Sequence, residues 1–347
     1  MRIGTQASYS GGFTQTAAEL RDLESAGLDV AAVAEVYTFD AVSQLGYLAA
    51  VTERVELLSA IFPIYSRTPA LTAMTAAGLD FVSNGRFTLG LGASGPQVIE
   101  GWHGVPYDAP LQRTREVVEI CRKVWRRERV EHHGKKYDIP LAEGQGTGLG
   151  KPLKLINTPV RERIPVMLAA LGPKNVELAA EIAEAWEPIF FMPERAQSVW
   201  GDALAAGKAK RDPELGDLQV VTGVPVAIGE HLPDDLLDRV RPGLALYIGG
   251  MGARGKNFYN DLAVRYGFEA EAKEIQDLYL DGKKDEAASR VPDDLVRATS
   301  LIGPESHVAE RIAAFREAGV TTLMVQPLDG SPEGRLTTIE TMKKLTN

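Results

Sequence analysis

The sequence predicts a (β/α)8 barrel, an α/β fold in which eight parallel strands alternate with helices. Two observations support this prediction. Short apolar runs, bounded by turns and too short for helices, alternate along the chain with segments of helical periodicity. The chain has 347 residues, a length that such a barrel can occupy as one domain. We therefore expect a single barrel domain over residues 1–347.

Eight runs have the composition of buried parallel strands. The fourth is the clearest, because Asn84 and Gly85 supply a turn before it and small residues follow it. The expected strands are residues 2–8, 30–34, 55–64, 87–91, 164–171, 189–192, 218–228 and 320–326.

The segments between these runs carry signals for helix ends. Asp40 is a fitting N-cap for the second helix, Pro69 suits the first turn of the third, and Gly27 ends the first. The expected helices are residues 14–26, 41–51, 69–80, 111–127, 173–185, 194–209, 308–318 and 335–345.

Two segments interrupt this alternation. Residues 130–153, rich in His, Gly and Lys, follow the fourth strand, and residues 239–297, largely helical in composition, follow the seventh. Because strands and helices resume after each segment, we interpret both as insertions into the barrel rather than as domain boundaries. Substrate specificity would reside in these insertions.

Composition and charge exclude several classes of protein. The net charge of −9 and the absence of a dense basic cluster argue against a nucleic-acid or anionic-membrane partner. No apolar run is long enough to span a membrane, and no signal peptide precedes the first strand, so we expect a cytoplasmic protein. The single cysteine, Cys121, cannot form an internal disulfide, and the five histidines show no spacing for a metal site.

Small residues follow three of the expected strands, at the ends where ligands bind in β/α barrels. Small side chains there would leave a broad, flat, apolar slot suited to a planar ring. Glu35, after the second strand, would accept hydrogen bonds from such a ligand. The alternatives are tight strand-to-helix packing for the small residues and a solvated surface acid for Glu35. The small residues are Ser59 and Ala60, Gly92, Ala93, Ser94 and Gly95, and Ala170, Leu171, Gly172 and Pro173.

The dinucleotide-binding pattern is missing after the first strand, which disfavours a nicotinamide cofactor. Several separated motifs, in order, instead resemble the luciferase-like monooxygenase superfamily of flavin and deazaflavin barrels. The motif Ala169-Ala170-Leu171-Gly172-Pro173-Lys174-Asn175 resembles its branch that uses coenzyme F420. The other motifs are Arg67-Thr68-Pro69-Ala70, Leu79-Asp80, Ser83-x-Gly85-Arg86-Phe87-x-Leu89-Gly90-Leu91-Gly92, Arg115-Glu116, Met251-Gly252, Asn257-Phe258-Tyr259 and Leu301-Ile302-Gly303-Pro304.

The resemblance implies a cofactor site at the barrel mouth. It implies a bulge with a non-prolyl cis peptide at Ser59-Ala60 behind the cofactor ring, and assembly as a homodimer or larger homo-oligomer. The cofactor-binding residues it implies are Glu35, Ser59, Ala60, Gly92, Ala93, Ser94, Ala170, Leu171, Gly172, Pro173 and Asn175.

The sequence departs from relatives of known activity. Glu35-Val36 stands where alcohol- and sugar-phosphate-oxidising members have Asp-His, and Gln6 stands where pterin-reducing members have an acid. His103 is the imidazole nearest to the fourth strand end in sequence, so Glu35 and His103 are the candidate catalytic residues. A packed or capping histidine is the alternative.

We therefore expect an F420-dependent oxidoreductase that transfers a hydride between the deazaflavin and an unidentified small organic substrate. An FMN-dependent monooxygenase is the alternative within the superfamily. A non-catalytic flavin-binding protein is a second class. A metal-dependent hydrolase is a third, which the lack of clustered His and Asp at the strand ends disfavours.

Overall fold

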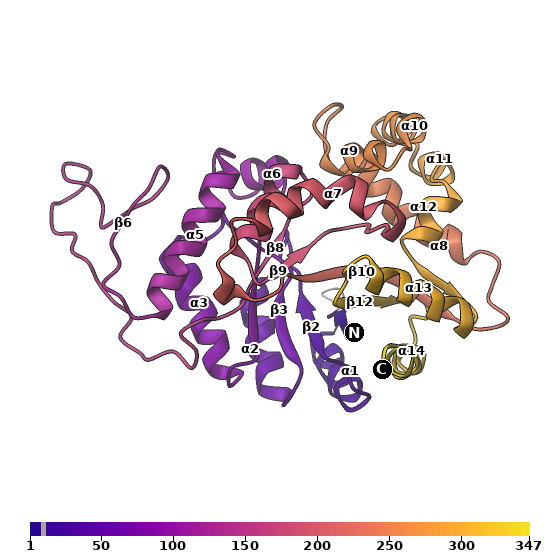
Figure 1. The fold of residues 1–347 in the computed structure, drawn as a ribbon, viewed down its shortest axis with the longest axis horizontal. Helices are drawn as coiled ribbons and strands as arrows, with labels where there is room; N and C mark the ends of the chain where they lie inside the picture. Colours follow the sequence, from indigo (N-terminus) through magenta and orange to yellow (C-terminus); the bar gives the residue numbers. More distant parts are fainter. Residues whose placement is uncertain (8–11) are drawn as a thin grey trace.

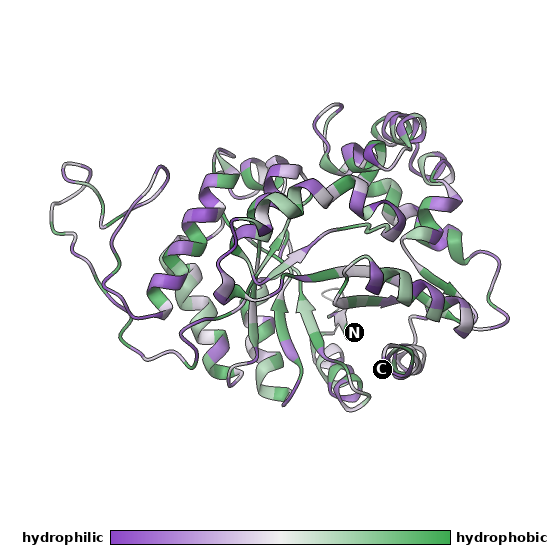
Figure 2. Ribbon diagram, in the orientation of Figure 1, coloured by the Kyte–Doolittle hydropathy of each residue, from purple (hydrophilic) through white to green (hydrophobic). Residues whose placement is uncertain are grey.

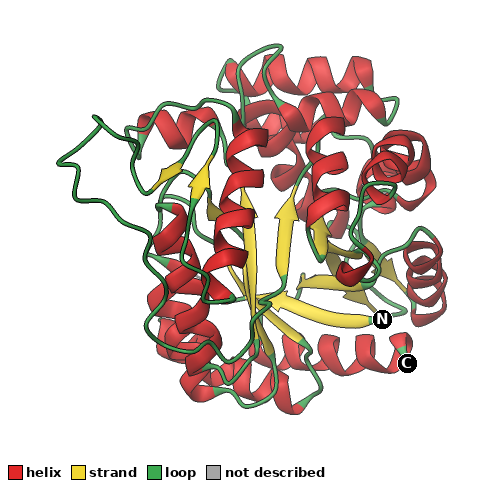
Figure 3. Ribbon diagram, turned by 60° about the vertical axis from the view of Figure 1, so that its left-hand side comes forward, coloured by secondary structure: helices red, strands yellow, loops and turns green. Residues whose placement is uncertain are grey.

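A computed structural model describes residues 1–7 and 12–347. Within these residues, eight parallel strands, one of them interrupted, form a barrel surrounded by helices (Figures 1 and 3). The barrel closes because β10 pairs with both β9 and β12, and β12 pairs with β1. This confirms the predicted (β/α)8 barrel. Its strands are β1 (Arg2–Gln6), β2 (Val30–Val33), β3 (Glu56–Ser59) continued by β4 (Phe62–Pro63), β5 (Phe87–Gly92), β8 (Val166–Ala169), β9 (Ala185–Glu187), β10 (Gln219–Ile228) and β12 (Thr322–Pro327).

Alternate side chains of the strands face the barrel interior, because successive residues of a strand point to opposite faces of the sheet. The inward side chains fill the barrel, while the outward ones join the larger core beneath the helices. Figure 2 shows this pattern as hydrophobic strands surrounded by helices of mixed polarity. The buried interior cluster is formed by Val30, Ala32, Leu58, Met167, Ala185, Val221 and Met324.

Two of the surrounding helices begin at the residues that the sequence signals predict. The Asp40 carboxylate accepts a hydrogen bond from the Ser43 N–H at 2.9 Å, and Thr68 caps the helix that Pro69 begins. A short helix, α4 (Pro96–Gly101), was not predicted. The main helices are α1 (Phe13–Ser25), α2 (Ala41–Val51), α3 (Pro69–Val82), α5 (Pro110–Trp125), α6 (Pro173–Ile182), α7 (Pro193–Lys208), α13 (Glu305–Glu317) and α14 (Pro332–Thr346).

The first insertion follows the fourth barrel strand, as predicted, and projects away from the barrel as an extended arm (Figure 1). Its base contains the antiparallel pair β6 (His132–His133) and β7 (Asp138–Ile139). The buried carboxylate of Glu116 in α5 accepts hydrogen bonds from the N–H groups of Lys135, Lys136 and Tyr137 at 2.9–3.1 Å. These bonds fix the arm to the barrel.

The second insertion follows the seventh barrel strand, also as predicted, and is helical. Its elements are α8 (Leu236–Ala245), the π-helical turn η2 (Leu246–Gly250), α9 (Phe258–Arg265), α10 (Glu269–Leu280), α11 (Lys284–Ser289) and α12 (Asp293–Ala298). Strand β11 (Leu301–Gly303) then pairs with the end of β10, and a 3-10 turn, η1 (Pro213–Leu215), precedes β10.

The sixth strand was predicted wrongly. It was expected at residues 189–192, whereas β9 is Ala185–Glu187 and α6 ends three residues earlier than expected. The Glu184 N–H donates to the Val166 carbonyl at 2.9 Å, so the backbone enters the sheet at Glu184. Residues 189–192 are apolar because Phe191 packs on Trp200 and Phe315. In the first strand, the expected residue Ser8 lies outside the described residues.

Candidate cofactor and substrate site at the barrel mouth

The small residues predicted at three strand ends lie side by side, because β3 and β4 both pair with β5, and β5 pairs with β8. Ser59 is fully buried, and its hydroxyl both donates to the Gly90 carbonyl at 3.0 Å and accepts the Gly90 N–H at 2.8 Å. A Cβ at Gly90 would lie 1.7 Å from the Ser59 carbonyl oxygen. Ser59 therefore joins the two strands, and its hydroxyl is already engaged within the sheet.

The cis peptide expected at Ser59-Ala60 is found one bond later, between Ala60 and Ile61. The pairing of β3 with β2 continues as far as Ala60, because the Ala60 N–H still donates to the Val33 carbonyl at 2.9 Å. Ala60 and Ile61 then separate β3 from β4 and pack against the interior cluster.

The floor of the mouth is formed by Ile61, Gly92 and Ala169. A Cβ at Gly92 would lie 3.0 Å from the Ile61 side chain and 3.5 Å from the Ala169 Cβ. Gly92 therefore keeps this surface low and flat, which is the shape that a planar ring requires.

Ala169 was not predicted as a site residue, whereas its neighbour Ala170 was. The alternation of the strand places Ala169 on the inner face and the Ala170 side chain in the outer core. The Ala170 carbonyl accepts the Trp186 indole N–H at 2.9 Å, and the Leu171 carbonyl accepts the Trp200 indole N–H at 3.2 Å. This strand end is thus fixed by two tryptophans.

Beyond it, α6 begins at Pro173 with Gly172 as N-cap and no side-chain cap. The first N–H groups of a helix have no partner within the helix, and they favour anions such as phosphate. Asn175 lies in this first turn and is partly exposed.

At the end of β5, Ser94 adopts a left-handed conformation with φ 57°, and its carbonyl accepts a hydrogen bond from the Tyr107 hydroxyl at 3.4 Å. Ala93 is partly buried against the outer core.

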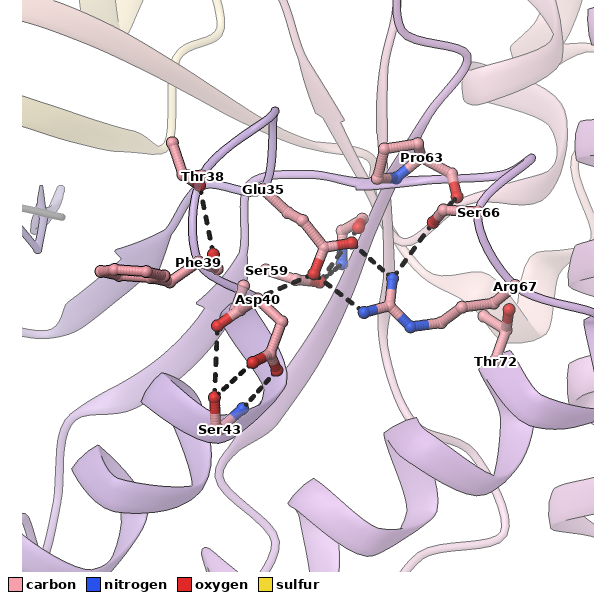
Figure 4. A network of polar contacts seen from close by, with 12 residues as sticks. Glu35, Thr38, Phe39, Asp40, Ser43, Ser59, Pro63, Ser66, Arg67 and Thr72 are labelled. Carbon is pink, nitrogen blue, oxygen red and sulfur yellow. Dashed lines mark hydrogen bonds and ion pairs between the residues drawn. The ribbon is translucent and has the colours of Figure 1, made fainter. Parts of the chain in front are cut away.

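Glu35 follows β2 and forms an ion pair with Arg67, which sequence analysis did not predict as a site residue. The guanidinium contacts both carboxylate oxygens, at 2.6 and 2.8 Å, and the Ala41 N–H donates to the same carboxylate at 3.1 Å (Figure 4). Both side chains are nearly buried, and Arg67 also stacks on Phe62 at 4.3 Å. Arg67 and Ala41 thus bind the carboxylate oxygens that were expected to accept hydrogen bonds from a ligand. The roles expected of Glu35 in cofactor binding and in catalysis stay predictions.

His103 follows α4, and its backbone N–H donates to the Val98 carbonyl at 3.2 Å. Its Nε2 atom is buried without a hydrogen-bond partner among the described residues. The imidazole is therefore not oriented by a carboxylate, and its role as proton donor also stays a prediction.

The site contains a carboxyl group that sequence analysis missed. Glu187 ends β9 in register with Ala169, so its side chain lies on the inner face at the mouth. No side chain among the described residues is recorded as a hydrogen-bond partner of this carboxyl, and burial raises its pKa to about 7. The residue is nevertheless only partly buried, so the fold does not enclose it completely.

Aromatic groups surround the same region. Burial raises the pKa of Tyr259, and Tyr247, Glu187 and Tyr107 raise it further. The rings of Tyr247 and Tyr259 are 4.8 Å apart, and Phe190 contacts Tyr247 at 5.3 Å. Glu187 is thus close enough to this aromatic group to raise the pKa of the Tyr259 phenol.

The loop after β9 is tightly held. The Ala170 N–H donates to the Glu187 carbonyl at 3.2 Å, and the Thr222 hydroxyl donates to the Pro188 carbonyl at 3.3 Å. The buried Tyr266 hydroxyl donates to the Phe190 carbonyl at 2.8 Å and accepts the Met192 N–H at 3.2 Å. Because the sixth strand was expected at residues 189–192, sequence analysis did not recognise Glu187 as the end of a barrel strand. A carboxyl group at the end of such a strand is the signal that would have identified it as a site residue.

A cavity of about 600 Å³ lies at the opposite end of the barrel, where Arg2, Asp29 and Glu56 begin or precede strands. Its partly buried cation Arg86 donates to the carbonyls of Ala49, Thr52 and Val55 at 2.7–3.1 Å. These bonds serve the fold, since this end of a β/α barrel contributes stability rather than chemistry. We therefore place the candidate site at the mouth.

The described residues contain neither a membrane-spanning helix nor a cluster of metal ligands. No helix among them is long and apolar enough to cross a membrane, and no group of three or more His, Cys, Asp or Glu in that part of the chain could hold a metal ion.

The fold and the site define a (β/α)8 barrel with a flat-floored site at the carboxyl ends of its strands. Residues 1–322 match the model of the luciferase-like monooxygenase family. The chain therefore belongs to the luciferase-like monooxygenase family, which confirms the resemblance seen in the sequence.

Individual relatives extend over nearly the whole chain. A Mycobacterium tuberculosis protein, provisionally named a coenzyme F420-dependent oxidoreductase, is 42% identical over 331 residues, covering 94% of each chain. The 5,10-methylenetetrahydromethanopterin reductase of Archaeoglobus fulgidus is 28% identical over 323 residues, covering 90% of this chain and 87% of the relative. The solved coenzyme F420-dependent tetrahydromethanopterin reductase of Methanopyrus kandleri shares the fold, with a TM-score of 0.79 at 21% identity, covering 98% of this chain and 96% of that one.

Proposed function

We propose that this chain is an F420-dependent oxidoreductase that exchanges a hydride between the deazaflavin and a small organic substrate. The observation that carries the proposal is the mouth floor, where Ile61 lies against Gly92 and Ala169 beside an interrupted third strand. The names of the relatives support the choice of cofactor.

The residues at the mouth fit such a cofactor in shape and in charge. Ile61, Gly92 and Ala169 would lie against the ring, and the uncapped start of α6 at Gly172 would take an anionic phosphate. When bound, F420 supplies hydride transfer at the central carbon of its ring. The chain contributes orientation and the exclusion of water, and the aromatic groups around Glu187 suit that task.

Titration of the purified protein with F420 and with FMN, followed by cofactor fluorescence, tests the proposal. We expect saturable binding of F420 and weaker binding of FMN. Failure of the wild-type protein to bind F420 would refute the proposed function, and preferential binding of FMN would favour the monooxygenase alternative.

A variant then tests the location of the site. Ala169→Leu adds bulk to the floor and should weaken F420 binding by about 10-fold or more, because overpacking costs roughly 1–3 kcal/mol and 1.4 kcal/mol is tenfold. Ala50→Leu makes the same change at an exposed position of α2 and should leave the affinity unchanged. Equal affinities of the two variants for F420 would show that the cofactor does not bind against this floor.

A further inference from the structure

We propose that Glu187 is the catalytic acid–base residue of this mouth, giving the proton to the substrate in the reductive direction and taking it back in the oxidative direction. This inference rests on the proposed function, and it assigns the proton transfer to a carboxyl group that sequence analysis did not identify.

The first argument is position. Glu187 is paired in register with Ala169, which forms the floor together with Gly92. Neighbouring strands lie about 4.8 Å apart, so the Glu187 side chain rises from the inner face one strand away from the floor. A ligand that rests on the floor and fills the mouth would therefore lie within reach of this carboxyl.

The second argument is availability. The other acid at the mouth, Glu35, is held by Arg67 and by the Ala41 N–H. Glu187 has no recorded hydrogen-bond partner among the described residues, although its own backbone and that of Pro188 are fixed by hydrogen bonds. A rigidly placed carboxyl that the fold does not use is what acid–base catalysis requires.

The third argument is electrostatic environment. Among the described residues, the titratable groups that raise the pKa of Tyr259 together with Glu187 are the phenols of Tyr107 and Tyr247, and a phenol carries no charge near pH 7. No cation contributes to the pKa of Glu187, which burial alone raises to about 7. Both protonation states are then accessible at neutral pH, so the group can act as an acid and as a base.

The proton balance is simple in the reductive direction. A substrate C=O or C=N carbon receives a hydride with its two electrons from the reduced cofactor, and the π-electron pair moves to the heteroatom. That heteroatom takes the proton of the Glu187 carboxyl, the Oε–H bond breaks, and solvent later returns a proton to the carboxylate. In the oxidative direction the Glu187 carboxylate would accept the proton of the substrate O–H or N–H group, while the adjacent C–H bond breaks and its hydride passes to the cofactor.

The test compares the wild-type protein with Glu187→Gln, which keeps the size of the side chain but cannot exchange a proton. Glu162→Gln makes the same change at an exposed position and serves as the control. Infrared difference spectra of the F420-loaded proteins, recorded across pH 5 to 9, should show a protonated carboxyl that disappears near pH 7 in wild type and control. This band should be absent from Glu187→Gln, whose affinity for F420 should stay within about threefold of wild type.

Turnover gives an independent readout. Cyclohexanone, 2-cyclohexenone and 1-pyrroline serve as probe acceptors, and for those that wild type reduces, Glu187→Gln should lower kcat about 100-fold or more with little change in KM. The inference is overturned if the titrating band persists in Glu187→Gln, if that variant loses F420 binding, or if it reduces the same acceptors at the wild-type rate. Failure of wild type to bind F420 would instead refute the proposed function, since the titration of Glu187 can still be measured in the free protein.

Discussion

Gly90→Ala should destabilise the barrel at the point where β3 and β5 support the mouth. A Cβ at this position would lie 1.7 Å from the Ser59 carbonyl oxygen, and that atom belongs to the backbone of a paired strand. Overpacking of this kind costs roughly 1–3 kcal/mol. Separation of the strands would also weaken the two hydrogen bonds between the Ser59 hydroxyl and Gly90, at about 0.5–1.5 kcal/mol each.

The expected loss in the free energy of unfolding is therefore about 2–6 kcal/mol, measured by urea denaturation followed by circular dichroism. Gly78→Ala is the matched control, because Gly78 lies within α3 and an added Cβ would meet no atom within 4 Å. That variant should gain about 0.5–1 kcal/mol. A Gly90→Ala protein within 1 kcal/mol of wild type would refute the inference that Ser59 and Gly90 are in obligatory contact.

Three further predictions concern charge and reactivity. Arg67→Met should lower the free energy of unfolding by roughly 3 kcal/mol, because it leaves the nearly buried Glu35 carboxylate without its ion-pair partner; a loss below 0.5 kcal/mol in urea denaturation would contradict this. The folded protein holds the Glu187 proton more tightly than the unfolded chain does, so this contribution to stability is full below pH 4.5 and is lost as the pH rises through about 7. Between pH 4.5 and about 7, this proton binding changes the free energy of unfolding by at most about 3 kcal/mol. Unfolding curves at pH 5 and pH 8 should therefore show a smaller pH dependence of stability in Glu187→Gln than in wild type. Cys121 is fully buried, and burial raises the pKa of its thiol to about 12, so it should react with a thiol reagent only after unfolding.

The arrangement of the barrel was predictable from sequence because it depends on local patterns. The alternation of apolar runs with helical segments gave seven of the eight strands, and Asp40 and Pro69 marked two helix starts. The sixth strand failed because residues after Ile182 continue an alanine-rich helical pattern, whereas pairing with β8 takes them into the sheet. Tertiary pairing overrode local propensity at this point.

The site was less predictable, because its decisive contacts join residues that are distant in sequence. Nothing near Glu35 indicates that Arg67, 32 residues later, engages both of its oxygens. The choice between Ala169 and Ala170 depends on strand register, which a single sequence does not specify. Glu187 was missed for the same reason, because its place at the mouth depends on the position and register of β9, the strand that it ends.

Tyr266 connects the second insertion to the candidate site at the mouth. Its hydroxyl clamps the loop that follows Glu187, at Phe190 and Met192, from a position just beyond α9. A change in this insertion that moved Tyr266 would therefore also shift the loop that follows Glu187. Remodelling of this one helical segment could thus reach the candidate site through a single tyrosine, without any substitution in the barrel strands themselves.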